Sequence, residues 1–366
     1  ILVGGNFSSF NANVSNSIVR LNSDGTKDTS FNIGIGFDGE VNTIVVQSDG
    51  KLLIGGGFSN YKGEISDKAI RLNNDGTKDI NFNTGFVFDG QVKIIKLQPN
   101  GKILVAGNFS SFSGAASNRI IRLNNNGSKD NAFQYGLGFD ATIYSTAMQN
   151  NGKILVGGRF TCYNGKITNK ITRINETGFK DDTFNIGGTG FNHQLNITQV
   201  NSIVVQNDGK ILAGGSFSSY NGELSYNIIR LNNDGTKDNT FITNLGFNNL
   251  VKSIAIQTDG KILVGGNFTS YNGQLSKGLI RLNNDGSIDN TFNNGINNYS
   301  YALLDVIVIQ NDGKILIGGW INNDITGTGN ILIRLNNDGT VDNTFTIGSG
   351  NSRVSTIAIQ TDGKIL

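Results

Sequence analysis

Residues 259–268 read DGKILVGGNF and residues 230–241 read RLNNDGTKDNTF, and variants of both stretches recur along the chain. The arginine that opens the second stretch marks seven copies, which are spaced by 51, 51, 51, 57, 51 and 53 residues: Arg20, Arg71, Arg122, Arg173, Arg230, Arg281 and Arg334. Self-similarity at a nearly fixed period is typical of repeat architectures. The chain is therefore predicted to consist of seven copies of one structural unit.

Each copy contains four short apolar runs, exemplified by 41–47, 51–58, 69–73 and 78–82. Four short strands with turn residues between them predict one four-stranded antiparallel blade of a β-propeller. The chain stops at 362–366 and begins at 1–5 within the same run of the repeat, so one blade is expected to be shared between the termini. The prediction is an all-β fold in which 1–366 form a single closed seven-bladed β-propeller with a seam between Leu366 and Ile1. An open solenoid of the same period is the structural alternative.

Composition narrows the classes of partner. The 366 residues include 50 Gly, 1 Pro and 16% charged residues, which suits an all-β chain. With 30 basic and 28 acidic residues the net charge is +2, so nucleic acid is not an expected partner. No apolar stretch approaches the roughly 18 residues of a membrane span, so membrane insertion is not expected either. Cys162 is the only cysteine and leaves the redox compartment open. Because Ile1 lies inside a repeat, we expect the chain to be a module of a longer polypeptide.

The two stretches DGKILVGGNF and RLNNDGTKDNTF resemble the delta-60 repeat, or DUF5122-type, β-propellers of bacterial secreted and surface proteins, and the resemblance covers the whole chain. The placing of the two glycines is also similar to that of kelch propellers. The resemblance implies an extracellular or cell-surface location in a bacterium. It implies an architecture and not an activity.

The turn at 22–26 suits a three-residue hairpin loop with glycine in the left-handed position. Such a loop places each repeated arginine opposite the aspartate eight residues later. Seven cross-strand ion pairs are predicted: Arg20 with Asp28, Arg71 with Asp79, Arg122 with Asp130, Arg173 with Asp181, Arg230 with Asp238, Arg281 with Asp289 and Arg334 with Asp342. We interpret them as structural, and a ring of charge that grips a ligand is the alternative. A calcium loop around Asn232, Asp234 and Asp238 is disfavoured because the terminal bidentate glutamate is missing.

Two further residues recur in all seven copies. The second glycine of the 51–58 run, Gly56 and its equivalents, is expected to allow close approach of a neighbouring backbone. A glutamine ends the 41–47 run in each copy: Gln47, Gln98, Gln149, Gln206, Gln257, Gln310 and Gln360. These glutamines are expected to satisfy backbone groups between blades, and a ring around a channel mouth is the alternative.

No catalytic site is predicted. The only histidine, His193, lies in a polar loop, which favours a solvated residue over a general base. Paired carboxylates near the innermost strands would suit a glycosidase, but only Glu40 and Asp305 are available. Basic residues oppose them: Lys93, Lys96, Lys252 and Arg353. The expectation is a protein that is not an enzyme and that has no cofactor and no metal.

Three segments break the sevenfold symmetry, namely 185–199, 293–303 and 320–330. The candidate binding residues that they contribute are Trp320, Tyr299, Tyr301, Asp324 and His193. Aromatic rings beside amide side chains suit recognition of a protein or a carbohydrate, and neutral drift of one repeat is the alternative. The aromatic residues at the equivalent position of the other six loops are expected to pack these loops onto the blades: Phe10, Tyr61, Phe112, Tyr163, Tyr220 and Tyr271.

The function predicted from these patterns is that of a non-catalytic recognition or scaffold module of an extracellular bacterial protein, in adhesion, in surface assembly or as secreted cargo. Its partners would be a protein or carbohydrate ligand and other domains of the same longer chain or assembly. A phage tail or receptor-binding component and a glycan-active enzyme are the two alternatives. The full-length sequence would distinguish a phage component from a bacterial surface module, and a hydrolysis screen on polysaccharides would test whether the protein is an enzyme.

Overall fold

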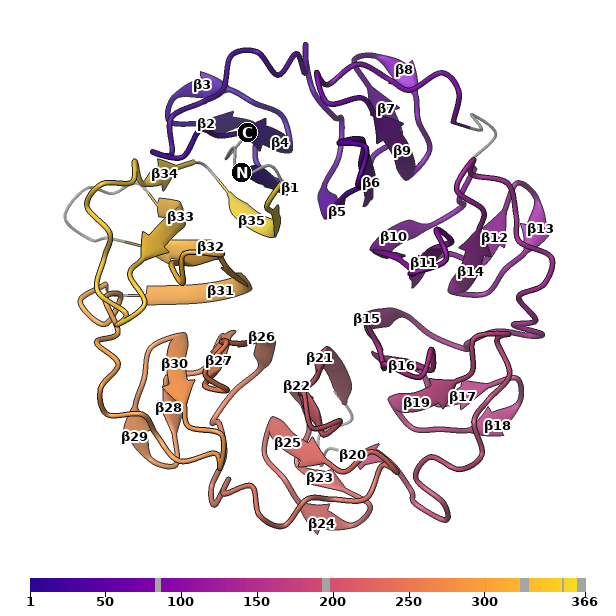
Figure 1. Cartoon of the computed structure of the whole chain (residues 1–366), viewed down its shortest axis with the longest axis vertical. Helices are drawn as coiled ribbons and strands as arrows, with labels where there is room; N and C mark the ends of the chain where they lie inside the picture. The colour runs from indigo at the N-terminus through magenta and orange to yellow at the C-terminus, as the bar shows by residue number, and fades with distance from the viewer. Residues whose placement is uncertain (83–86, 193–197, 300, 323–328, 351, 361–366) are drawn as a thin grey trace. The chain divides into compact units, whose positions relative to one another are not determined.

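The computed structural model describes residues 1–82, 87–192, 198–299, 301–322, 329–350 and 352–360, and all regular elements there are β-strands (Figure 1). These residues form two compact units. The first comprises 1–130, 299–301 and 308–366, and the second comprises 131–298 and 302–307. No helix among the described residues has the length and hydropathy that a membrane span requires.

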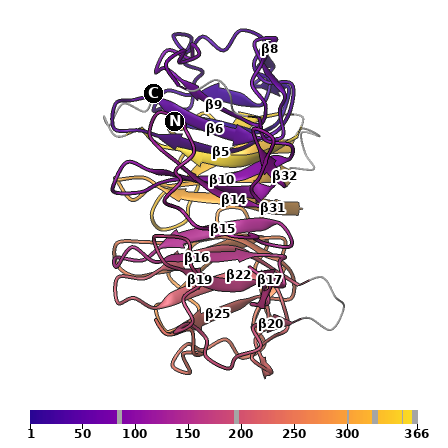
Figure 2. The same cartoon turned by 90° about the vertical axis from the view of Figure 1, so that its right-hand side faces the viewer.

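The first unit contains three regular blades of three main strands each. They are β5 (Val41–Val46), β6 (Leu52–Gly56) and β9 (Ala69–Leu72); β10 (Gln91–Leu97), β11 (Ile103–Asn108) and β14 (Ile120–Leu123); and β35 (Arg353–Ala358), β1 (Leu2–Asn6) and β4 (Ile18–Arg20). Figure 2 shows β5, β6 and β9 side by side. In the last of the three, which we call the seam blade, β35 pairs with β1 in antiparallel register, Leu2 opposite Ala358. The prediction that both ends of the chain build one blade is confirmed, although Leu366 itself lies outside the described residues.

The second unit repeats this arrangement. Its blades are β15 (Ile143–Met148), β16 (Ile154–Gly158) and β19 (Ile171–Ile174); β21 (Gln199–Val205), β22 (Ile211–Ser216) and β25 (Ile228–Leu231); and β26 (Val251–Ile256), β27 (Ile262–Gly266) and β30 (Leu279–Leu282). Strand β31 spans Tyr301–Ile309.

A β-bulge recurs in the innermost strand of each regular blade. In β5 the register against β6 shifts between Val41 and Thr43. A bulge bends and twists its strand, and here it turns the Thr43 hydroxyl toward the next blade. The Thr43 Oγ1 atom accepts a hydrogen bond of 3.4 Å from the Ile95 backbone amide. In the second unit the Ser145 hydroxyl accepts the equivalent bond from Ile203.

The second repeated glycine lies where two backbones meet, as predicted. A Cβ atom on Gly56 would collide with the carbonyl oxygen of Glu40, which lies just before the neighbouring strand β5. Branched side chains fill the space on either side: Ile44, Ile54 and Ile70 belong to one buried apolar cluster. Close packing of this kind requires glycine at this position.

The predicted fourth strand is much shorter than expected. Where a strand over 78–82 was predicted, a single bridge joins Lys78 to Leu72. The Asp79 Oδ1 atom accepts the Asn81 backbone amide at 3.0 Å, and the Phe82 amide bonds to the Asp79 carbonyl. Because the aspartate side chain competes for backbone amides in this way, the strand ends in a turn.

A small outer hairpin that was not predicted occupies the loop after the second strand of each regular blade. The six hairpins are β2 (Ser9–Phe10) with β3 (Asn13–Val14), β7 (Asn60–Tyr61) with β8 (Glu64–Ile65), β12 (Ser111–Phe112) with β13 (Ala115–Ala116), β17 (Cys162–Tyr163) with β18 (Lys166–Ile167), β23 (Ser219–Tyr220) with β24 (Glu223–Leu224) and β20 (Phe191–Asn192), and β28 (Ser270–Tyr271) with β29 (Gln274–Leu275). Lys62 and Gly63 both have positive φ, as a two-residue hairpin turn requires.

One blade departs from this plan, and we call it the divergent blade. Its strands β32 (Ile315–Asn322) and β33 (Gly329–Leu335) continue as one long hairpin in place of the outer hairpin, and β34 (Gly348–Ser349) pairs with β33 (Figure 1). The β34 edge contacts the seam blade, where the Asn11 Oδ1 atom accepts the Ser349 amide at 2.8 Å.

Candidate functional site

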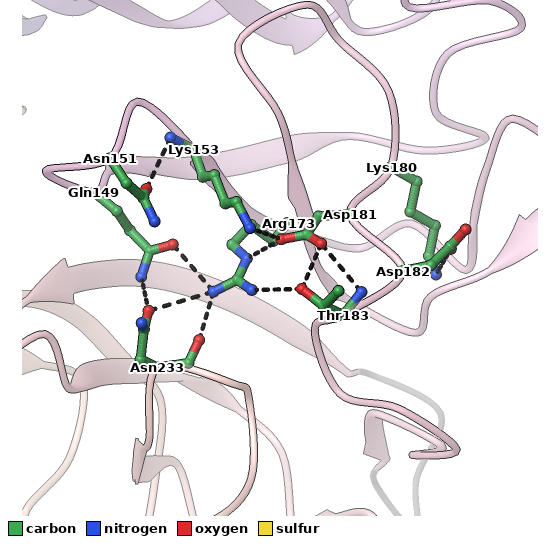
Figure 3. A network of polar contacts seen from close by, with 9 residues as sticks. All are labelled: Gln149, Asn151, Lys153, Arg173, Lys180, Asp181, Asp182, Thr183 and Asn233. Carbon is green, nitrogen blue, oxygen red and sulfur yellow. Dashed lines mark hydrogen bonds and ion pairs between the residues drawn. The ribbon is translucent and has the colours of Figure 1, made fainter.

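The repeated arginine and aspartate lie in a buried cluster that also includes a lysine. Figure 3 shows the cluster around Arg173, whose Nε atom lies 2.6 Å from the Asp181 Oδ2 atom. The Lys153 ammonium group lies 2.8 Å from the same oxygen, and the Asp181 Oδ1 atom accepts the Thr183 hydroxyl. Burial alone would raise the pKa of Asp181, but the hydrogen bonds from Lys153, Thr183 and Arg173 hold it well below its usual range.

All seven contacts that the eight-residue offset predicts are present. The nitrogen-to-oxygen distances are 2.6 to 2.7 Å, and the arginine side chains are 4–8% exposed. A lysine from the start of the second strand joins six of them: Lys51, Lys102, Lys153, Lys210, Lys261 and Lys314. We call each such group an Arg–Asp–Lys cluster.

Several clusters also reach the next blade. Arg71 donates through Nη1 to the Asn125 carbonyl at 2.8 Å, and Arg334 donates to the Ser23 carbonyl at 2.7 Å across the ends of the chain. The guanidinium group of Arg71 also lies 4.2 Å from the centre of the Phe82 ring. Because the donors and the charge are used within the fold, the clusters link blades, and a free ligand-gripping ring of charge is not what these groups form.

Four of the repeated glutamines donate to an asparagine side chain, whereas backbone partners were predicted. The Gln47 amide donates to the Asn125 Oδ1 atom at 3.1 Å, and Gln149 contacts Asn233 in the same way. The asparagine partner belongs to the hairpin turn of the next blade, which the period of the repeat alone does not place beside the glutamine.

The oxygens of the disfavoured calcium loop are also engaged. The Asp234 Oδ1 atom accepts the backbone amide and the hydroxyl of Thr236, at 2.9 and 2.7 Å. Asp238 pairs with Arg230 and Lys210. In the described part of the chain, no group of three or more His, Cys, Asp or Glu side chains is arranged to hold a metal ion.

The two carboxylates near the innermost strands lie beside cations. The Asp305 carboxylate lies 2.5 Å from the Lys252 ammonium group. Glu40 lies 3.9 Å from Lys93 and accepts the Ser355 hydroxyl at 2.9 Å. Burial lowers the pKa of Lys93 and of Lys96, and Glu40 partly opposes this effect at Lys93.

The candidate binding residues divide into described and undescribed positions. Trp320 is half-buried near the end of β32, where its indole ring packs over Gly329 of β33. Tyr301 begins β31 with 51% of its surface exposed, and Tyr299 is half-buried just before it. His193 and Asp324 lie outside the described residues. The six aromatic residues of the other loops are buried in the outer hairpins. The ring centre of Tyr61, for example, lies 4.6 Å from that of Phe37.

A polar groove in the seam blade was missed at the level of sequence. It has a volume of about 400 Å³ and is lined by Asn6, Asn16, Ser17, Asp38 and Ser352 among others. The signal that could have found it is the residue three positions before the repeated arginine, which is Ser17 here and Lys68, Arg119 or Lys170 in three other blades. A small residue at this position leaves space that a long side chain would occupy.

Comparison with known families agrees with this architecture. Seven segments match the family described as "Domain of unknown function (DUF5122) beta-propeller": residues 1–31, 47–82, 98–133, 149–184, 206–241, 257–292 and 310–345. The chain belongs to this family. No curated protein is significantly similar in sequence to this DUF5122 beta-propeller.

Several solved structures are similar to the DUF5122 beta-propeller at low sequence identity. The WD40 beta propeller domain of Doa1 is 14% identical over 96% of each chain, with a TM-score of 0.51. A protein of unknown function from Bacteroides caccae is 13% identical, over 96% of this chain and 93% of that one, with a TM-score of 0.40. The extracellular domain of the putative one component system BT4673 from B. thetaiotaomicron is 14% identical over 92% of this chain and 39% of that one, with a TM-score of 0.48. These likenesses concern the fold and not the function.

Proposed function

We propose that this DUF5122 beta-propeller is a non-catalytic recognition or scaffold module of an extracellular bacterial protein, acting in adhesion, in surface assembly or as secreted cargo. The observation that carries the proposal is the exposure of Trp320 on the divergent blade and of Tyr301 at the start of β31. The aromatic residues of the regular loops are buried, whereas Tyr301 is 51% exposed and Trp320 is half-buried at the end of an extended hairpin.

Exposed tryptophan and tyrosine side chains suit recognition because they offer a large rigid apolar face together with a hydrogen-bonding group. Trp320 is held in place by its contact with Gly329, so less conformational entropy is lost when a ligand binds. The extracellular location rests on the resemblance of the repeat to those of bacterial secreted and surface proteins.

The indole of Trp320 makes the recognition role directly testable, because it is the only tryptophan of the chain. The protein is applied to an array of bacterial glycans and surface proteins, and each ligand that binds is titrated while the tryptophan fluorescence is recorded. We expect a saturable change in emission from the natural protein. Binding by Trp320→Ala, which lacks the fluorophore, is measured by isothermal titration calorimetry and should be at least tenfold weaker, with an unchanged melting temperature.

Two further measurements address the rest of the proposal. A hydrolysis screen on the same glycans is expected to release no product. Fractionation of the producing cells is expected to place the full-length protein outside the cytoplasm. Hydrolysis of a glycan, or a cytoplasmic location together with unaltered binding by Trp320→Ala, would contradict the proposal.

A further inference from the structure

The groove in the seam blade is open at a position that varies among the copies and carries a small residue here. Ser17 lies three residues before Arg20, in a left-handed conformation with φ of 64°. The equivalent Lys68 has φ of 69°, and its ammonium group donates to the Ser59 hydroxyl at 2.8 Å. Ser59 is the equivalent of Ser8, which lines the groove of the seam blade. The lysine side chain therefore lies across the place that is open beside Ser17.

The other regular blades close the same place in other ways. Arg119 donates to the Phe109 carbonyl at 3.3 Å, and burial lowers the pKa of Lys170. The Asn227 side chain bonds to the backbone of Phe217 and Phe247. At Gly278 the Ala302 backbone approaches so closely that an added Cβ would lie 2.8 Å from its carbonyl oxygen. The seam blade thus differs from these blades by an uncovered polar groove.

Several polar side chains of the groove can form hydrogen bonds beyond those that they make within the described residues. Asn16 donates through Nδ2 to the Ile35 carbonyl at 2.7 Å, which fixes the side chain and leaves its Oδ1 atom without a partner among the described residues. The side-chain amide of Asn6 and the hydroxyl of Ser17 likewise have no hydrogen bond to the described part of the chain. The Asp38 Oδ2 atom accepts one hydrogen bond, from the Asn60 side chain at 2.7 Å, and a carboxylate oxygen can accept a second.

The charge and polarity of the groove indicate which class of ligand it can bind. Asp38 is the charged residue of the described lining, so a phosphate or carboxylate group would meet a like charge. One carboxylate is too few for a calcium ion, which takes six to eight oxygen ligands. An apolar molecule would cover amide and hydroxyl groups without bonding to them, which is unfavourable. A neutral molecule with several hydroxyl groups both donates and accepts.

We propose that the groove lined by Asn6, Asn16, Ser17 and Asp38 binds a neutral sugar. This inference deepens the recognition role proposed above and rests on it. Phe7 and Phe37 lie behind the polar lining and are each 3% exposed, so the sugar ring would be held by hydrogen bonds more than by stacking. The dissociation constant for one sugar residue is expected in the millimolar range. A chain of several sugar residues should bind more tightly.

The test titrates the protein with the methyl glycosides of glucose, galactose and mannose and with N-acetylglucosamine, and monitors binding by saturation-transfer NMR. The decisive variant is Ser17→Lys, which introduces the side chain that the next blade carries in the same backbone conformation. We expect saturable binding of at least one sugar by the natural protein, at least tenfold weaker binding by Ser17→Lys and an unchanged melting temperature. Asn6→Ser, which adopts the residue of Ser216 in another blade, is expected to weaken binding several-fold.

Lys68→Ser is the matched control, because it removes the lysine from the equivalent place in another blade. There Gly57 occupies the position of Asn6, so the side-chain amide of Asn6 has no counterpart. The variant should leave sugar binding unchanged. Absence of binding for all four sugars, equal binding by Ser17→Lys, or tighter binding of glucose 6-phosphate than of methyl glucoside would each overturn the inference. If sugar binding is absent while the Trp320-dependent binding persists, the groove inference fails and the recognition role stands. If both are absent, the recognition role fails as well.

Discussion

Arg20 and Ser17 lie three residues apart in the same stretch of the seam blade, yet they behave in opposite ways. The Arg20 side chain is buried and donates to Asp28 and to the carbonyl of Asn74 in the next blade. Ser17 lines a groove that faces solvent. The arginine is the same in all seven copies, whereas the position of Ser17 differs from copy to copy and carries Lys68, Arg119 and Lys170 in three of the others. The repeated residues therefore hold blades together, and a surface becomes available for binding at a position where the copies differ.

Acidification is expected to have the largest effect on stability, because it protonates the aspartates of all the Arg–Asp–Lys clusters at once. Burial by itself raises the pKa of the repeated aspartates, but hydrogen bonds from the paired arginine, from the lysine where one is present, and from nearby backbone amides and hydroxyls lower it below the usual 3.8 at Asp28, Asp79, Asp181, Asp238, Asp289 and Asp342. A lowered pKa in the folded state contributes stability above the unfolded pKa, which is lost as the pH falls through the folded value. The free energy of unfolding in urea should stay level from about pH 7 to 5 and fall steeply below about pH 4.

Asp238→Asn provides the control for this acid transition. It removes one titrating group, so its free energy of unfolding is lower at pH 7 but should fall less between about pH 5 and 2. A free energy of unfolding that is independent of pH across this whole interval would contradict the view that these clusters hold the blades together.

Arg230→Met tests a single cluster and should have the next largest effect. The substitution leaves Asp238 buried with Lys210 as its remaining cation and removes the bond from Arg230 to the Asn284 carbonyl. Breaking a buried ion pair by removing one partner costs about 3–5 kcal/mol. Urea denaturation should show a loss of that order, with sugar binding at the Ser17 groove unaltered.

The exposed pair of Lys166 and Asp182 is the comparison for Arg230→Met. Both side chains are 61% exposed at a distance of 3.0 Å. Surface pairs contribute about 0–1 kcal/mol, so Lys166→Ala should be nearly neutral. Equal losses in the two variants would mean that burial does not distinguish the repeated clusters.

Features set by local geometry could be predicted from the sequence. The turn at 22–26 sets the register, so Arg20 lies opposite Asp28. The shared blade was predictable from the matching ends of the repeat. Contacts between residues 28 apart, such as Lys51 on Asp79, or with the next blade, such as Asn125 on Arg71, depend on how strands and blades pack. The spacing of a motif does not contain that information.

The fourth strand was predicted too long, and the groove was not predicted, for a related reason. The run 78–82 has the composition of a strand, but Asp79 bonds to the backbone two residues later and ends it. For the candidate site, attention to the most divergent segments identified Trp320 and Tyr301, whereas the groove depends on one small residue in an otherwise regular copy. Ser17 is conspicuous only when it is compared with Lys68, Arg119 and Lys170 at the same position.

Tyr61→Phe should have a small effect on stability, and it tests whether every variation among the copies has functional meaning. The Tyr61 hydroxyl is buried and donates to the Gly76 carbonyl at 2.6 Å, and burial raises the pKa of Tyr61 so that it remains protonated. Phe10 and Phe112 occupy the same position in other blades without a hydroxyl and are buried too. Loss of one such hydrogen bond costs about 1 kcal/mol, so the urea midpoint should fall slightly and sugar binding should not change. This variation between Tyr and Phe lies in the core and opens no surface, unlike Ser17. A change in sugar binding by Tyr61→Phe would therefore show that variation in the core and variation at the surface do not have separate effects.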